Sequence, residues 1–176
     1  MSDDLPILIR PDRVWTGEGE ARSGWSVLVV DDRIVVAGAK VEVPEDAKTV
    51  DLPGCTLLPG LMDLHSHLFL HPYSETPWDD QVLKEAEAYR TVRAVNHARM
   101  TLKTGFTLLR DLGTEGAGYA DVALKRAIDE GLTEGPRLVV ATRAIVATGS
   151  YGPARASPSP VHTRSGRSRI GRLSFI

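Results

Sequence analysis

The feature that most constrains the fold is a change of hydrophobic pattern at Pro59-Gly60. Before this point, short runs of β-branched residues are separated by Gly, Pro and Asp, a pattern typical of short strands. After it, apolar runs of strand length alternate with longer segments of helical period. We therefore predict an all-β portion followed by an α/β portion.

In the first portion we predict a small antiparallel β unit. Asp31-Asp32 separates two valine-rich runs and is a plausible hairpin turn. The predicted strands span residues 7–9, 13–15, 26–30, 33–37, 49–51 and 56–58. In the second portion the predicted order is βαβαβ, which favours a parallel sheet. Its strands span residues 61–67, 106–109 and 137–141, and its helices span 78–103 and 120–130.

Composition narrows the class of protein. The 176 residues include 42% hydrophobic residues, but no apolar run approaches the roughly 18 to 20 residues of a membrane-spanning helix. The N-terminus is acidic and lacks the apolar centre of a signal peptide, so we predict a cytoplasmic protein. The single cysteine, Cys55, excludes an internal disulfide and a cysteine-based zinc cage.

The residues most suggestive of chemistry are two histidines at the end of the 61–67 strand. Side chains two apart on a strand share a face, so His65 and His67 can converge on one metal ion. Asp63 shares that face and can orient a ligand. The carboxyl ends of parallel strands are where α/β folds place their active sites. A chance His-x-His pair is the alternative, and this position in the predicted fold argues against it.

The LPGLMDLHSH segment at residues 58–67 resembles the opening of the amidohydrolase superfamily. The FTLLRDLG segment at 106–113 resembles the second barrel strand of its imidazolonepropionase-like and Xaa-Pro-dipeptidase-like branch. The resemblance implies a small β-sandwich at 1–58 and the first βα units of a (β/α)8 TIM-like barrel at 59–153. It also implies hydrolysis of an amide, peptide or lactam with one or two divalent metals, most often zinc, and makes His65 and His67 the first two metal ligands.

The family's remaining site residues have no counterpart in this sequence. A two-metal site also uses a carboxylated lysine, two later histidines and an aspartate, and nothing after Pro153 resembles them. The 118 residues from Pro59 onward compare with about 250 in a closed barrel, so we predict an incomplete barrel and an incomplete catalytic set.

Several residues near the predicted strand ends are candidates for lining a substrate pocket. His71 and Tyr73 follow the first strand, with loop packing as an equal alternative, whereas Arg110 ends the second strand and Tyr151 follows the third. Arg110-Asp111 also suits an ion pair that fixes a loop. We interpret His97 as a surface or helix-packing residue.

The last segment, 154–176, differs in character from the rest of the chain. It contains five arginines and neither lysine nor acid, whereas the first 153 residues hold 16 basic and 23 acidic residues. We interpret it as an unrelated or frameshifted tail. The alternatives are a disordered end, or a basic tail that binds nucleic acid, against which the near absence of aromatic residues argues.

The sequence thus predicts a truncated metal-dependent amidohydrolase, inactive by itself, that acts in its intact form on a small-molecule amide or peptide. A homo-oligomer is compatible with this prediction, and neither a membrane nor a nucleic acid is an expected partner. The alternative is a non-catalytic fragment or partner-dependent binding module with a basic tail.

Overall fold

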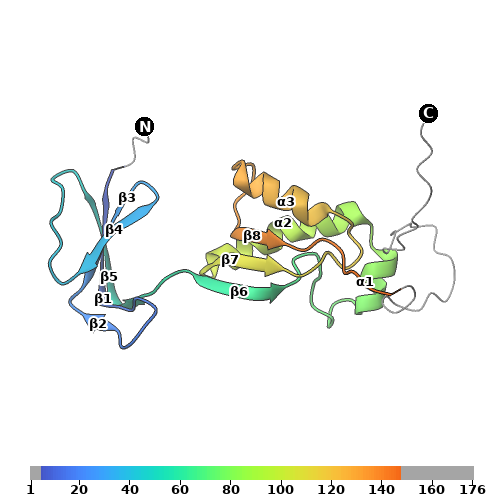
Figure 1. Cartoon of the computed structure of the whole chain (residues 1–176), viewed down its shortest axis with the longest axis horizontal. Coiled ribbons are helices and arrows are strands. Elements are labelled where there is room, and N and C mark those ends of the chain that lie inside the picture. Colours follow the sequence, from blue (N-terminus) through green and yellow to red (C-terminus); the bar gives the residue numbers. More distant parts are fainter. Residues whose placement is uncertain (1–4, 148–176) are drawn as a thin grey trace. The chain divides into compact units, whose positions relative to one another are not determined.

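A computed structural model describes residues 5–147 of the chain. Two compact units divide between Pro59 and Gly60, and we call them unit 1 and unit 2 (Figure 1). The predicted tail at 154–176 and Tyr151 lie outside the described residues.

Unit 1 is built around one long strand. Strand β1 (Ile7–Val14) pairs antiparallel with β2 (Arg22–Ser23) and β3 (Ser26–Val30), and parallel with β5 (Lys48–Leu57). Strand β4 (Arg33–Gly38) pairs with β3 across the predicted hairpin turn, in which Asp31 has a φ of 52°. Asp tolerates this left-handed conformation better than most residues, which explains its place in the turn.

Two expectations for unit 1 are wrong. The unit is not wholly antiparallel, because β5 returns to lie parallel to β1. The gaps predicted at residues 10–12 and 52–55 lie inside continuous strands. The described strands of unit 1 form one five-stranded sheet. The β1–β5 register shifts between Pro11 and Arg13, and such an irregularity accommodates a proline that cannot donate to the ladder.

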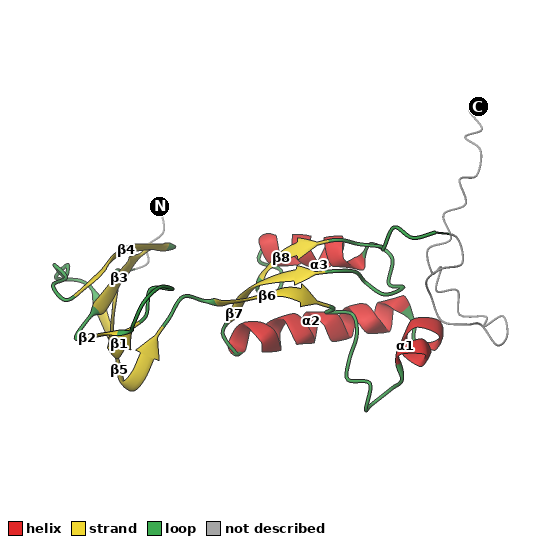
Figure 2. Ribbon diagram, turned by 60° about the horizontal axis from the view of Figure 1, so that its bottom comes forward, coloured by secondary structure: helices red, strands yellow, loops and turns green. Residues whose placement is uncertain are grey.

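Unit 2 contains a parallel sheet of three strands in the order β6 (Leu61–Ser66), β7 (Phe106–Asp111) and β8 (Arg137–Val140). Helices α2 (Glu87–Lys103) and α3 (Ala120–Asp129) connect these strands and contact each other (Figures 1 and 2). The buried core between the helices and the sheet includes Ala94, Ala98, Leu109, Leu124 and Leu138. The predicted βαβαβ order is therefore present.

The predicted 78–103 helix is in fact two helices, α1 (Trp78–Lys84) and α2. Glu85 and Ala86 between them have extended backbone, with ψ values of 134° and 139°. Both residue types favour helix, so local propensity does not explain the break. The Glu85 carboxylate instead bonds the His71 ring, a tertiary contact that sequence periodicity does not reveal.

Gly135 lies where the chain enters β8, and it lacks room for a side chain. A Cβ atom there would lie 2.5 Å from Ile128 Cδ1 and 3.3 Å from Ala98 Cβ. We expect Gly135→Ala to lower the free energy of unfolding by about 1–3 kcal/mol through overpacking, as measured by urea denaturation. The loss should shrink in an Ile128→Val background, and Gly38→Ala, which meets open space, is the matched control. An equal loss in both backgrounds would contradict the overpacking argument.

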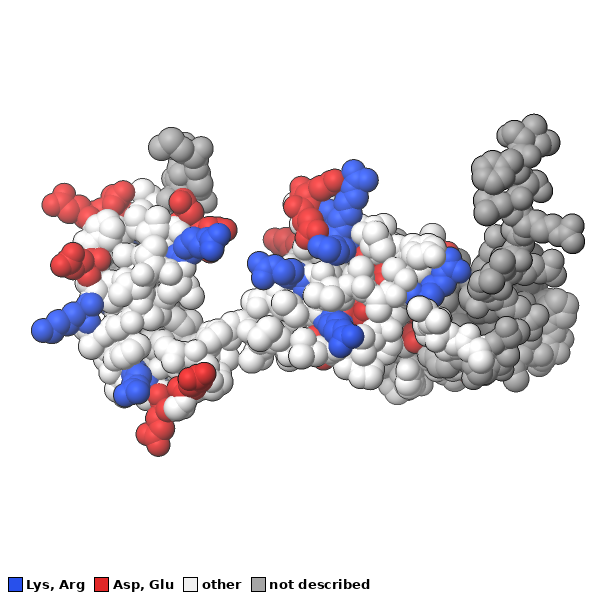
Figure 3. Space-filling model, in the orientation of Figure 1, with Lys and Arg blue, Asp and Glu red and all other residues white. Residues whose placement is uncertain are grey.

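Charged side chains of both signs are interspersed on the face shown in Figure 3. Within residues 5–147, no helix is both long and apolar enough to cross a membrane.

Candidate metal centre

The carboxyl ends of β6 and β7 meet at one edge of the unit 2 sheet. Ser66, the last residue of β6, pairs with Asp111, the last residue of β7, and Asp111 pairs in turn with Val140 of β8. The arrowheads of the three strands point the same way in Figure 1, so the loops after them begin side by side. The loop after β7 contacts one member of the predicted histidine pair, His67, through Gly113.

The two predicted metal ligands lie next to each other at this edge. The ring centroids of His65 and His67 are 5.4 Å apart, in an edge-to-face arrangement. The His65 side chain is exposed, whereas His67 follows the last residue of β6 and keeps 28% of its side chain exposed. His67 Nδ1 lies 3.0 Å from the carbonyl oxygen of Gly113. A carbonyl can only accept, so this contact requires a proton on Nδ1, and in the neutral ring it leaves the lone pair on Nε2.

Asp63 contacts the backbone rather than an imidazole. Its Oδ1 accepts a hydrogen bond from the main-chain N–H of His65 at 2.9 Å. The β6–β7 register shifts between Asp63 and Ser66, which interrupts the regular alternation on which the shared-face prediction depended. Asp63 therefore fixes the backbone of a candidate ligand.

Asp111 is a residue whose importance the sequence reasoning missed. Its carboxylate is fully buried and accepts hydrogen bonds from the backbone N–H groups of Leu68 and Gly113, each at 3.0 Å. Burial raises the pKa of Asp111, and the two backbone hydrogen bonds oppose that rise. Asp111 thus ties the loop after β6 to the loop after β7. These contacts are with main-chain N–H groups. They replace the Arg110–Asp111 ion pair that the sequence suggested, and the Arg110 side chain is exposed.

A cavity of about 490 Å³ opens beside His67. Four predicted site residues line this cavity: Asp63, His67, His71 and Tyr73. His97, predicted to be a surface or helix-packing residue, also lines it, whereas His65 and Arg110 do not. Tyr73 is 60% exposed. His97 Nδ1 lies 2.8 Å from the carbonyl of Leu68, so this histidine of α2 packs against the loop that follows His67.

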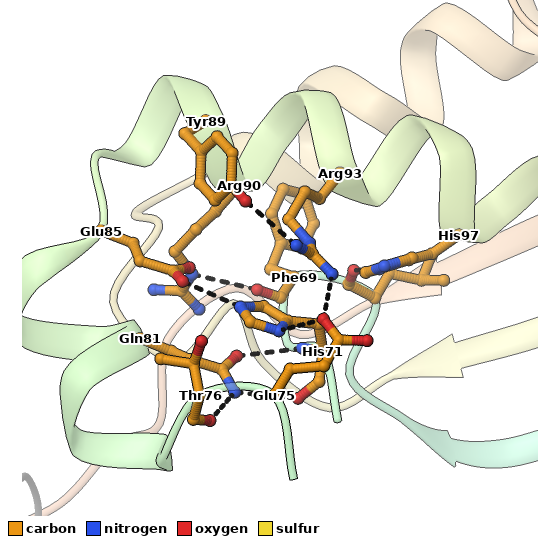
Figure 4. Close-up of polar contacts among 11 residues, drawn as sticks. Phe69, His71, Glu75, Thr76, Gln81, Glu85, Tyr89, Arg90, Arg93 and His97 are labelled. Carbon is orange, nitrogen blue, oxygen red and sulfur yellow. Dashed lines mark hydrogen bonds and ion pairs between the residues drawn. The ribbon is translucent and has the colours of Figure 1, made fainter. Parts of the chain in front are cut away.

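His71 is held by a buried polar network (Figure 4). Its ring nitrogens lie 3.1 Å from Glu75 Oε2 and 2.9 Å from Glu85 Oε1, and its side chain is only 2% exposed. The side chain of Gln81 bonds both the backbone N–H and the carbonyl of His71. These contacts favour loop packing over substrate contact as the role of His71. Glu75 also accepts a hydrogen bond from Arg93, which lowers the pKa of Glu75.

The histidine pair supplies nitrogen ligands of a kind that divalent metals bind, but it supplies only two of them. Neutral imidazoles suit zinc and similar ions, and a ring whose other nitrogen donates to a carbonyl is a common arrangement for a metal ligand. A four-coordinate zinc site needs four ligands. Among the described residues, no group of three or more His, Cys, Asp or Glu side chains is arranged to hold a metal ion.

Comparison with known proteins gives this arrangement a family context. Residues 56–168 match the model of the Amidohydrolase family, so the match continues into the segment that the sequence analysis separated as a tail. A dihydroorotase of Mycobacterium leprae (strain TN) is 41% identical over 64 residues, which are 36% of this chain and 14% of that protein. An imidazolonepropionase of Acidiphilium cryptum (strain JF-5) is 45% identical over 60 residues, 33% of this chain and 14% of that protein.

Solved structures agree with these matches. A crystal structure of an amidohydrolase superposes with a TM-score of 0.67 and 30% identity, over 92% of this chain and 40% of that one. A Xaa-Pro dipeptidase with methionine bound in its active site gives a TM-score of 0.65 and 28% identity, over 77% of this chain and 33% of that one. The chain thus spans well under half the length of these relatives. Its mixed β and α content is that of part of an amidohydrolase TIM-barrel fold. The family match, which covers more than half of the chain, and these superpositions show that the chain belongs to the amidohydrolase family.

Proposed function

We propose that this chain is the N-terminal portion of a metal-dependent amidohydrolase that cleaves a C–N bond in a small amide, peptide or lactam. The observation that carries the proposal is the histidine pair at the carboxyl edge of the parallel sheet, with the Nδ1 atom of His67 bonded to Gly113. The names of the relatives, dihydroorotase, imidazolonepropionase and Xaa-Pro dipeptidase, support the broad substrate class.

His65 and His67 are the residues that would hold the metal through their free ring nitrogens. A divalent ion, with zinc the leading candidate, supplies Lewis acidity that polarises a carbonyl and activates water. The chain's own residues arrange the site: Asp63 fixes the His65 backbone, and Asp111 fixes the two loops around His67. Tyr73, exposed in the cavity wall, is the proposed substrate contact.

A second candidate function is a non-catalytic fragment or partner-dependent binding module. The observation that favours it is the absence of a third metal-ligating side chain beside the pair within the described part of the chain. We propose accordingly that the 176-residue chain by itself has little or no hydrolase activity.

Metal binding and turnover by the purified chain test these proposals. We expect Co²⁺ titration, followed by the visible absorption of the bound ion, to detect a weak site that is lost on dialysis. His65→Ala and His67→Ala should each abolish that absorption because each removes one of two ligands. His162→Ala, which alters a histidine of the 154–176 segment, is the matched control.

The outcomes separate the candidates. No cobalt absorption by the unaltered chain would contradict the metal centre and favour the binding module. Stoichiometric metal retained through dialysis, with steady amide hydrolysis that His65→Ala removes, would contradict the proposed inactivity and establish a working enzyme.

A further inference from the structure

Arg90 is a fully buried cation whose hydrogen bonds go to the main chain. It lies in α2 with 0% exposure. Its Nε donates to the carbonyl of Phe69 at 3.0 Å, its Nη2 to that of Thr114 at 2.8 Å and its Nη1 to that of Glu115 at 2.8 Å. Burial lowers the pKa of Arg90, but a guanidinium stays protonated in proteins. These three carbonyls, together with the nearby carboxylates of Glu85, Glu115 and Glu87, stabilise the buried charge.

The three carbonyls belong to the two loops that meet at His67. Phe69 lies two residues after His67, and Thr114 directly follows Gly113, the residue that accepts the His67 Nδ1 hydrogen bond. The loop residues that Arg90 contacts are therefore only one or two positions away from His67 and Gly113, the two partners of that hydrogen bond. The Glu115 carboxylate, 3.9 Å from the same Nδ1 atom, also favours a proton there.

The fit around the guanidinium is close. A Cβ atom added at Gly116 would lie 3.5 Å from Arg90 Nη1 and 3.1 Å from Val82 Cγ1. The guanidinium is a rigid planar fork, so its donors reach three acceptors at fixed angles. A lysine ammonium at the same place would keep the charge but not this three-way geometry.

We propose that Arg90 is a positioning residue for the metal centre. By joining the two loops, it holds the Gly113 carbonyl against His67 Nδ1, which keeps neutral His67 in the Nδ1–H tautomer and leaves Nε2 free to bind the metal. The part of this proposal that concerns metal rests on the proposed function. The part that concerns the tautomer does not.

The test compares Arg90→Met with Arg93→Met in the full 176-residue chain. Arg93 lies one turn further along α2 and bonds the side chains of Tyr89 and Glu75, away from Gly113, which makes it a matched control. The primary measurement is the ¹⁵N NMR signature of the His67 ring, recorded without metal about two pH units above the ordinary histidine pKa of about 6.5. His67→Gln identifies the signal, and thermal denaturation reports the stability of each variant.

We expect the unaltered chain and Arg93→Met to show the Nδ1–H tautomer, and Arg90→Met to shift His67 toward Nε2–H. Cobalt affinity should fall about 10- to 100-fold in Arg90→Met, the range typical for residues that orient a metal ligand. Arg90→Lys should not restore either property, whereas a role through charge alone predicts that it does. Arg90→Gln, which keeps two donors, is the milder variant and should give an intermediate tautomer ratio if Arg90→Met does not fold.

Any of three results overturns the proposal. The first is an Nε2–H tautomer in the unaltered chain, the second is an unchanged tautomer in both Arg90→Met and Arg90→Gln, and the third is restoration by Arg90→Lys. If the tautomer responds as expected while no form of the chain binds cobalt, the positioning role stands and the proposed metal function fails.

Discussion

Phe69→Ala should lower the free energy of unfolding of unit 2 by about 3–5 kcal/mol, a large fraction of the total stability of a typical domain. Among residues 5–147, Phe69 is the largest apolar side chain that is fully buried, with 1% exposure, and it belongs to the core that α2, α3 and the sheet share. Removing its ring loses the transfer free energy of the buried carbons and leaves a cavity that the surrounding core only partly fills.

Hydrogen–deuterium exchange of peptides from residues 60–147, followed by mass spectrometry, measures this loss in unit 2 alone. We expect exchange to accelerate in α2, α3 and β7 together. Tyr73→Ala removes an aromatic ring that is 60% exposed on the same loop and should change exchange little. Similar effects for the two variants would show that Phe69 does not anchor the core.

The second large effect is expected at Asp111. Asp111→Ala removes the acceptor of two buried backbone N–H groups, those of Leu68 and Gly113. A buried donor left without a partner costs about 1–3 kcal/mol, so we expect a loss of about 2–6 kcal/mol in urea denaturation. Asp111→Asn keeps one acceptor oxygen and should lose less. Asp63→Ala, which removes one hydrogen bond to a neighbouring backbone group, is the matched control.

The Asp111 carboxyl also sets a dependence of stability on pH. Because burial raises its pKa in the folded protein, the folded state binds this proton more tightly than the unfolded state does. Its contribution to stability is therefore greatest below the unfolded pKa of about 3.9, and it is lost as the pH rises through the raised pKa of the folded state. The unfolding free energy of the unaltered chain minus that of Asp111→Asn should thus fall as the pH rises above the unfolded pKa of about 3.9. A difference that rises with pH would show that the charged form is the favoured one.

Some residues of the metal centre were predictable from the sequence, and others were not. The spacing of two residues was enough to predict that His65 and His67 lie next to each other near the end of β6. The roles of Arg90 and Asp111 were not predictable in this way, because their partners lie up to 43 residues away and are backbone groups that leave no sequence pattern. His71 carried two equal interpretations until its two carboxylate partners were known.

Features that depend on local contacts were predictable from residue type and spacing. The hairpin between β3 and β4, the alternation of strand and helix after Pro59 and the histidine pair all follow from residue type and short-range spacing. Three other features emerge only in the folded chain: the parallel return of β5 beside β1, the break between α1 and α2, and the contacts of Arg90 and Asp111 with the His67 loop. Each of these depends on hydrogen bonds between segments distant in the sequence, and the free energy of such bonds overrides the local conformational preference.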